Sequence, residues 1–416
     1  MSARVHTLAN GVRVVADPMP GLSSLALSVV VRGGARWEAA DENGYAHLLE
    51  HMVFKGAGDR GAQAIAEVIE AEGGQINAAT GFERTSYQVR CLKQGMPLAL
   101  EVLSDLVLHP WLDPEELERE KQVIGQEIAD AADTPDDRIF DLAQSAAFGE
   151  QALGRPILGT DASLRTADQA RLAAFHRRLY APDRIVVAAA GAVDEDALLA
   201  ATEHLFGAAL PQPELAPEAA SLIGGTRCEV RKLEQAQLVW LCEGVGLSDP
   251  DYEAQRVFAE ILGGGMASRL FQEVREKRGL AYAVDAYAAA YEDVGVLGVY
   301  AGCAAKDARQ AAALIVETLA DLADQATEME LQRAKAQGRA GLHFARESAL
   351  GRAEQAAAQL LIFGRLISIA ESEARLADVS LADLRRVGAR ALAGRQSAAI
   401  LGTKAASAAV KAFQRA

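Results

Sequence analysis

The chain has 416 residues, of which 50% are hydrophobic, and its net charge at pH 7 is -15. This length exceeds what one hydrophobic core usually serves, so we expect two or more domains. The acidic balance argues against nucleic acid as a partner, because binding it requires a basic surface. Apolar runs stay well short of the roughly 18 residues that cross a bilayer, so we expect no membrane association.

The pattern of the amino terminus, MSARVHTLANGVRVV, is typical of a strand from its first residues. It lacks the charged start and apolar stretch of a signal peptide, so we predict a cytoplasmic protein. The cysteines are scattered and form no C-x-x-C pair, which predicts buried, reduced thiols. They are Cys91, Cys228, Cys242 and Cys303.

The segment YAHLLEHMVF, residues 45–54, predicts a helix that packs against a core. Positions four apart share a helix face, so His47 and His51 should lie side by side, bordered by Glu50. Two imidazoles and a neighbouring carboxylate are typical of a zinc hydrolase, here in an order that inverts the common zincin motif. The alternative is a helix with two partly exposed histidines. The position of Glu50, together with the long segment around it that fits the same motif, favours zinc.

The next chemically informative segment is acidic, at residues 113–130. We predict a helix here, capped by Asp113, with Pro114 in its first turn. A catalytic zinc usually takes three protein ligands, and this helix is the obvious source of the third. Spacing places Glu120 and Glu127 on one face but does not choose the ligand. The candidates are Glu116, Glu118, Glu120 and Glu127.

The chain also repeats itself. EVLSDLV from Glu101 resembles ETLADLA from Glu317, and Gly191 after an apolar strand resembles Gly402, at offsets of 216 and 211. Two homologous halves are the simplest explanation. We predict an N-terminal zinc-binding domain at residues 1–210, a proline- and alanine-rich linker at 207–225, and a homologous C-terminal domain at 226–416.

Each half opens with strands, passes through an apolar helix, returns to strand and continues into alanine-rich helices. This order predicts an α+β fold, with a mixed, largely antiparallel sheet backed by helices in each half. Residues 1–210 carry 31 acidic and 18 basic side chains, which leaves a net charge of only -2 for the remainder. Solvated helix faces account for much of this acidity, but an acidic cleft would also favour basic peptides.

Three segments closely resemble the inverted-zincin peptidases of the pitrilysin and mitochondrial processing peptidase family, in its short bacterial form. They are HLLEHMVFKG from His47, GGQINAATGFERTSYQV from Gly73 and EREKQVIGQEI from Glu118. The resemblance is sharpest over residues 8–130 and 252–300, and the layout in two halves extends it across nearly the whole chain.

The resemblance assigns a role to each residue of the motif. It implies that His47, His51 and Glu127 bind one zinc ion per chain and that Glu50 is the general base. Glu120 would support the site; the alternative for it is an ordinary surface charge.

Two further segments are implied to bind substrate. Asn77, Ala78 and Ala79 match an edge strand to which an extended peptide adds by backbone hydrogen bonds. Arg275 and Tyr282 match a pair that reaches the substrate, where a tyrosine hydroxyl can stabilise the developing oxyanion. The alternatives are an ordinary short edge strand, a salt-bridged arginine and a core tyrosine.

We therefore predict a zinc-dependent endopeptidase that hydrolyses unfolded or short extended peptides, with a preference for basic ones. A chain of this length resembles half of the clamshell of the long relatives, which implies a homodimer that encloses a chamber. Two alternatives stay open: a non-catalytic scaffold subunit of the same family, or the catalytic subunit of a heterodimer.

Overall fold

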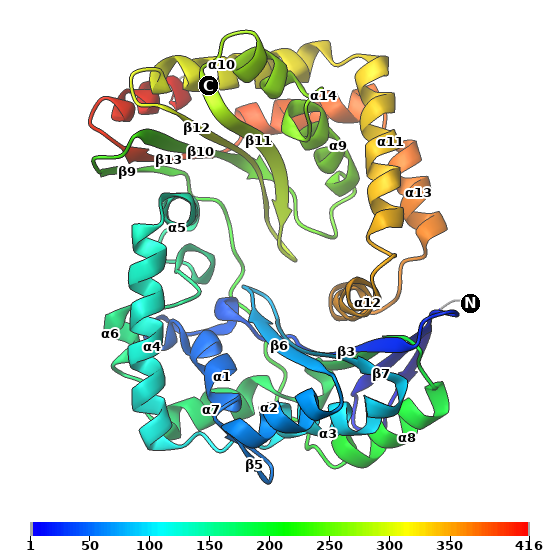
Figure 1. Ribbon diagram of the computed structural model, residues 1–416. Helices are drawn as coiled ribbons and strands as arrows, with labels where there is room; N and C mark the ends of the chain where they lie inside the picture. Colours follow the sequence, from blue (N-terminus) through cyan, green and yellow to red (C-terminus); the bar gives the residue numbers. More distant parts are fainter. Residues whose placement is uncertain (1–2, 415–416) are drawn as a thin grey trace. The chain divides into compact units, whose positions relative to one another are not determined.

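The computed structural model describes residues 3–414, which divide into two compact units (Figure 1). Neither unit is one continuous stretch of chain. The first holds the residues up to Ile128, Pro156–Glu218 and His343–Ile367. The second holds Ala129–Arg155, Ala219–Leu342 and the chain from Ser368 onward. Among the described residues, no helix is both long and apolar enough to cross a membrane.

A six-stranded sheet forms the centre of the first unit, in the order β1-β2-β8-β3-β7-β6. Neighbouring strands are antiparallel except β2 and β8, which are parallel. In β3, Leu27 and Val29 face one core while Val30 faces another, because helices cover both sides of the sheet. The strands are β1 Arg4–Thr7, β2 Arg13–Pro18, β3 Ser24–Val31, β6 Gln75–Thr80, β7 Thr85–Leu92 and β8 Ile185–Gly191.

Most helices of the first unit cover one face of this sheet. They are α1 Tyr45–Val53, α2 Ala62–Ala71, α3 Met96–Leu108, α4 Pro114–Asp133, α6 Asp161–Leu164, α7 Gln169–Leu179 and α8 Glu195–Phe206, with the short pair β4 Gly56–Ala57 and β5 Arg60–Gly61 after α1.

The opposite face is covered by α12, Ala349–Phe363, a helix from the C-terminal part of the sequence (Figure 1). Its small residues Ala353 and Ala357 pack closely on the strands. Arg352 of α12 forms a buried ion pair with Asp17 of β2, with 2.6 Å between Nε and Oδ2. Burial of both apolar and charged groups therefore attaches α12 to the first unit.

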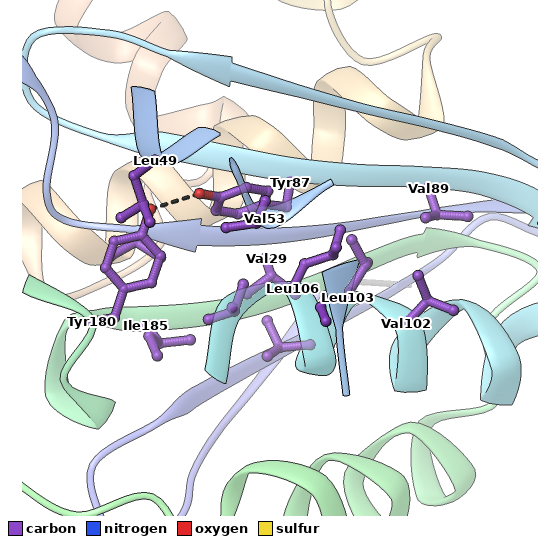
Figure 2. Close-up of a cluster of buried hydrophobic side chains, with 14 of the residues drawn as sticks. Val29, Leu49, Val53, Tyr87, Val89, Val102, Leu103, Leu106, Tyr180 and Ile185 are labelled. Atoms are coloured by element: carbon purple, nitrogen blue, oxygen red, sulfur yellow. Dashed lines mark hydrogen bonds between the residues drawn. The ribbon is translucent and has the colours of Figure 1, made fainter. Parts of the chain in front are cut away.

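The core of the first unit lies between the sheet and α1 and α3 (Figure 2). Leu49 and Val53, on the inner side of α1, pack beside Tyr87 of β7. The hydroxyl groups of Tyr87 and Tyr180 hydrogen-bond to each other at 2.6 Å inside this core. The fully buried inner side of α1 fixes which side of the helix faces outward.

The second unit is built around a five-stranded sheet in the order β11-β12-β10-β13-β9, with only β13 and β9 parallel. The strands are β9 Gly225–Val230, β10 Gln235–Gly244, β11 Ala281–Ala290, β12 Gly295–Ala304 and β13 Gln396–Gly402. Its helices are α5 Pro135–Phe148, α9 Tyr252–Gly263, α10 Ala308–Gln325, α11 Glu328–Phe344, α13 Ile369–Asp378, α14 Leu381–Ala393 and α15 Val410–Phe413. Helix α5, from the N-terminal part of the sequence, contacts β9, β10 and β13.

These sheets confirm the predicted α+β class, with largely antiparallel sheets backed by helices. The stretch between α8 and β9, residues 207–224, contains neither helix nor strand. All four cysteines are free as predicted, and three of them are buried. The prediction of burial is wrong for Cys228, because it lies on the edge strand β9, where most side chains are exposed.

Candidate metal centre

Helix α1 carries the predicted motif, and its start is fixed by a glycine and a buried glutamate. Gly44 precedes the helix with a φ of 91°, in the left-handed region that favours glycine. The carboxylate of Glu38 accepts hydrogen bonds from the backbone amides of Gly44 and Ala46, at 3.0 and 2.8 Å. These amides have no acceptor within the helix, so Glu38 satisfies donors that would otherwise be lost on burial.

The two histidines of α1 lie side by side, as their spacing predicts, with ring centroids 4.6 Å apart. Helix α4 brings Glu127 against them: its Oε2 lies 3.8 Å from Nε2 of His47 and 3.7 Å from Nε2 of His51. Around a tetrahedral zinc with bonds of about 2.0–2.2 Å, ligand atoms lie roughly 3.3–3.6 Å apart. The donor set and its spacing therefore fit a metal ion such as zinc, after a small contraction.

Glu120 lies behind the cluster on α4, and only 4% of it is exposed. Its Oε2 is 2.9 Å from Nδ1 of His51, and its Oε1 is 2.6 Å from Nζ of Lys55. Burial alone would raise the pKa of Glu120, but the hydrogen bonds from Lys55 and His51 outweigh it and lower the pKa. An ionised Glu120 accepts the Nδ1 proton of His51 and leaves its Nε2 lone pair available for a metal.

The surroundings of α1 shift the pKa values of two of its side chains, His47 and Glu50. Burial, and next the charge of His51, lower the pKa of His47 to about 4, so its imidazole is neutral near pH 7 as a metal ligand must be. Burial raises the pKa of Glu50, while interactions with the hydroxyl and the backbone of Thr80 oppose this change. Oε2 of Glu50 is buried and has no hydrogen-bond partner among the described residues. This oxygen is free to accept a proton.

The predicted substrate strand, β6, is an edge strand of the first sheet. It pairs with β7 on one side, with Asn77 opposite Gln88 and Ala78 opposite Tyr87. Within the described part of the chain, no strand pairs with its other side. Asn77 and Ala79 are exposed and Ala78 is half-buried. The free backbone groups and small side chains of β6 suit the addition of an extended peptide.

Arg275 and Tyr282 belong to the second unit and lie together there. The guanidinium carbon of Arg275 is 4.7 Å from the ring centroid of Phe271 and 5.4 Å from that of Tyr282. Tyr282 is 74% exposed, so the alternative of a core tyrosine is wrong. The cation over two aromatic rings holds this pair at the surface.

Two residues beside the cluster were not singled out in the sequence, Lys55 and Thr80. Lys55 stands in the HLLEHMVFKG segment four residues after His51, but it follows the end of α1, where helical spacing no longer predicts contacts. Thr80 ends β6, and its contact with Glu50 depends on how α1 packs on the sheet. The acidic helix itself was predicted correctly: Asp113 accepts hydrogen bonds from the amides of Glu115 and Glu116.

Comparison with known proteins gives the family. Residues 13–161 match the family described as Insulinase (Peptidase family M16), and residues 166–337 match the one described as Peptidase M16 inactive domain. An uncharacterized zinc protease of Rickettsia bellii is 35% identical over 400 residues, covering 96% of this chain and 97% of that protein. An uncharacterized zinc protease of Bacillus subtilis is 36% identical over 369 residues, covering 86% and 88%.

Solved structures share the fold. A protease from Helicobacter pylori matches with a TM-score of 0.89 and 22% identity, over 96% of this chain and 99% of that one. A peptidase M16 inactive domain from Pseudomonas fluorescens matches with a TM-score of 0.89 and 21% identity, over 97% and 99%. The fold is thus that of two-domain peptidase-like proteins. The chain belongs to peptidase family M16, the insulinase and pitrilysin family, which confirms the family predicted from the motifs.

Proposed function

We propose that this protein is a zinc metalloendopeptidase. The observation that carries the proposal is the convergence of His47, His51 and Glu127 beside Glu50, whose Oε2 has no other described partner. One zinc ion per chain, held by the first three residues, would supply a Lewis acid that lowers the pKa of water to about 7 and polarises a peptide carbonyl. The names of the relatives support zinc as the metal.

Each of the residues around the ion has a separate role in peptide hydrolysis. Oε2 of Glu50 accepts a proton from the attacking water and delivers it to the leaving amide nitrogen. Glu120 keeps the His51 ring in one orientation through the bond to Nδ1. Strand β6, through Asn77, Ala78 and Ala79, holds an extended peptide by its main chain, so that unfolded or short extended peptides are the substrates.

The substrate chamber and its charge are part of the proposal. Two chains form a homodimer that encloses the substrate, and the partner's Arg275 and Tyr282 complete each site. The net negative charge of residues 1–210 favours peptides that carry lysine or arginine. The cytoplasmic location stays a prediction.

The decisive experiment compares Glu50→Gln and His51→Ala with the wild type for bound zinc and for cleavage of a quenched peptide. Glu50→Gln should retain zinc and lose about 10²–10⁴-fold in rate, because the ligands survive while the proton acceptor does not. His51→Ala should lose zinc as well. A Glu50→Gln protein that cleaves at the wild-type rate would refute this assignment of the base.

The same measurements separate the peptidase from its alternatives. A scaffold subunit would show no zinc-dependent cleavage in the wild type, and a heterodimer subunit would cleave only after addition of a second protein. The intact cluster of two histidines and Glu127 supports the peptidase.

A further inference from the structure

We propose that Lys55 is a positioning residue of the metal centre: it holds the Glu120 carboxylate against His51 and thereby sets how tightly the site retains zinc. The proposal rests on the zinc-binding part of the proposed function. It concerns a lysine outside the H-x-x-E-H motif, at the junction between α1 and β4.

The three side chains form one continuous chain of contacts within the first unit. Nζ of Lys55 is 2.6 Å from Oε1 of Glu120, and Oε2 of Glu120 is 2.9 Å from Nδ1 of His51. Each carboxylate oxygen thus has its own partner, and the carboxylate bridges the ammonium and the imidazole. Two partners on opposite oxygens restrict Glu120 to one orientation, which a single partner would not do.

The charge of Lys55 is needed because Glu120 is 4% exposed. A neutral imidazole offers a hydrogen-bond donor but no net charge, whereas a buried carboxylate requires a compensating cation or a full set of donors. Lys55, with its side chain 31% exposed, supplies that cation from the solvent side. Without that cation, the Glu120 carboxylate would turn toward solvent and hold His51 less firmly.

The two histidines differ in how they are held, which makes this chain of contacts decisive. Nδ1 of His47 is buried and has no hydrogen-bond partner among the described residues. Nδ1 of His51 is bound to Glu120. Partners of ligating histidines typically change metal affinity by about 10–100-fold. The Lys55–Glu120 pair is therefore the polar support of the centre that mutation can remove.

The test measures zinc affinity by competition with a chromophoric chelator, using zinc alone and the full-length chain. We expect Lys55→Met to bind zinc about 10-fold more weakly, and Lys55→Arg, which keeps the cation, to recover most of that loss. Lys121→Met is the matched control: Lys121 is the next residue on α4 and pairs with Glu118 at 2.6 Å. It removes an equal charge beside Glu120 and should leave the affinity unchanged.

A double-mutant cycle separates positioning from general damage to the fold. If Lys55 acts through Glu120, Lys55→Met adds little to the loss caused by Glu120→Gln, whereas independent effects add. Thermal unfolding of the metal-free variants checks their folding; should Lys55→Met not fold, Lys55→Gln replaces it in the cycle. Additive losses, or an affinity for Lys55→Met within about twofold of wild type, would overturn the proposal.

The readout keeps this inference distinct from the peptidase proposal, since it requires no peptide cleavage. If zinc binding depends on Lys55 but the protein has no hydrolytic activity, the peptidase proposal is refuted and the role of Lys55 is supported. If the protein shows zinc-dependent hydrolysis but its zinc affinity does not depend on Lys55, the role of Lys55 is refuted and the peptidase proposal is supported.

Discussion

Replacement of Arg352 by methionine should destabilise the first unit strongly, because α12 is attached to its sheet by a buried ion pair. Asp17 is only 3% exposed, and Arg352 contacts both of its carboxylate oxygens. Methionine keeps much of the side chain's volume but leaves the carboxylate buried without its cation. Breaking a buried pair in this way costs about 3–5 kcal/mol, a large share of the stability of a typical domain.

A matched exposed pair provides the control. Arg375 on α13 lies 2.5 Å from Glu371, with the two side chains 43% and 31% exposed. Arg375→Met removes the same type of interaction at the surface and should cost only about 0–1 kcal/mol. A double variant, Asp17→Asn with Arg352→Met, should recover much of the loss, since no buried charge remains.

The assay is urea unfolding, combined with hydrogen exchange at the amides of β2, β3 and β8. Exchange is needed because two compact units need not unfold in one step. We expect exchange in these strands to accelerate in Arg352→Met and to stay near wild type in Arg375→Met. Equal losses of stability in the two variants would refute the claim that the pair beneath α12 holds the helix in place.

The remaining predictions concern the dimer and its substrates. In a mixed dimer with Glu50→Gln in one chain and Tyr282→Phe in the other, one shared site carries both changes and the other carries neither, so about half the wild-type rate should return. A verified mixed dimer that stays inactive would argue that each site lies within one chain. Peptides with lysine or arginine should be cleaved faster than acidic ones of equal length, with an advantage that shrinks as salt rises; rates independent of peptide charge at low salt would contradict this.

Local geometry explains what could be predicted for the site. Residues four apart on a helix share a face whatever the helix packs against, so the pairing of His47 with His51 follows from spacing alone. The apolar positions between them, such as Leu49, are fully buried and turn the histidines outward. The cap at Asp113 also depends only on nearby residues, and it was predicted correctly.

Helical spacing does not identify Glu127 as the third member of the cluster. Glu120 and Glu127 share a face of α4, but only the packing of α4 beside α1 decides that Glu127 faces both Nε2 atoms while Glu120 lies behind His51. The family resemblance, rather than spacing, supplied that choice. Lys55 was missed for the same reason, since its contact with Glu120 joins the end of one helix to the middle of another.

The helices at residues 45–54 and 113–130, the α+β class and the face of α1 that carries the histidines follow from periodicity over a few residues, because that periodicity depends on backbone geometry that every helix and strand shares. In contrast, it is tertiary packing that places α12 on the first sheet and α5 on the second, each from the other half of the chain. Both helices are apolar on one side, and such a surface can be buried against any sheet of suitable shape. Which sheet it meets depends on the path of the whole chain and on pairs such as Arg352 with Asp17, whose partners lie hundreds of residues apart.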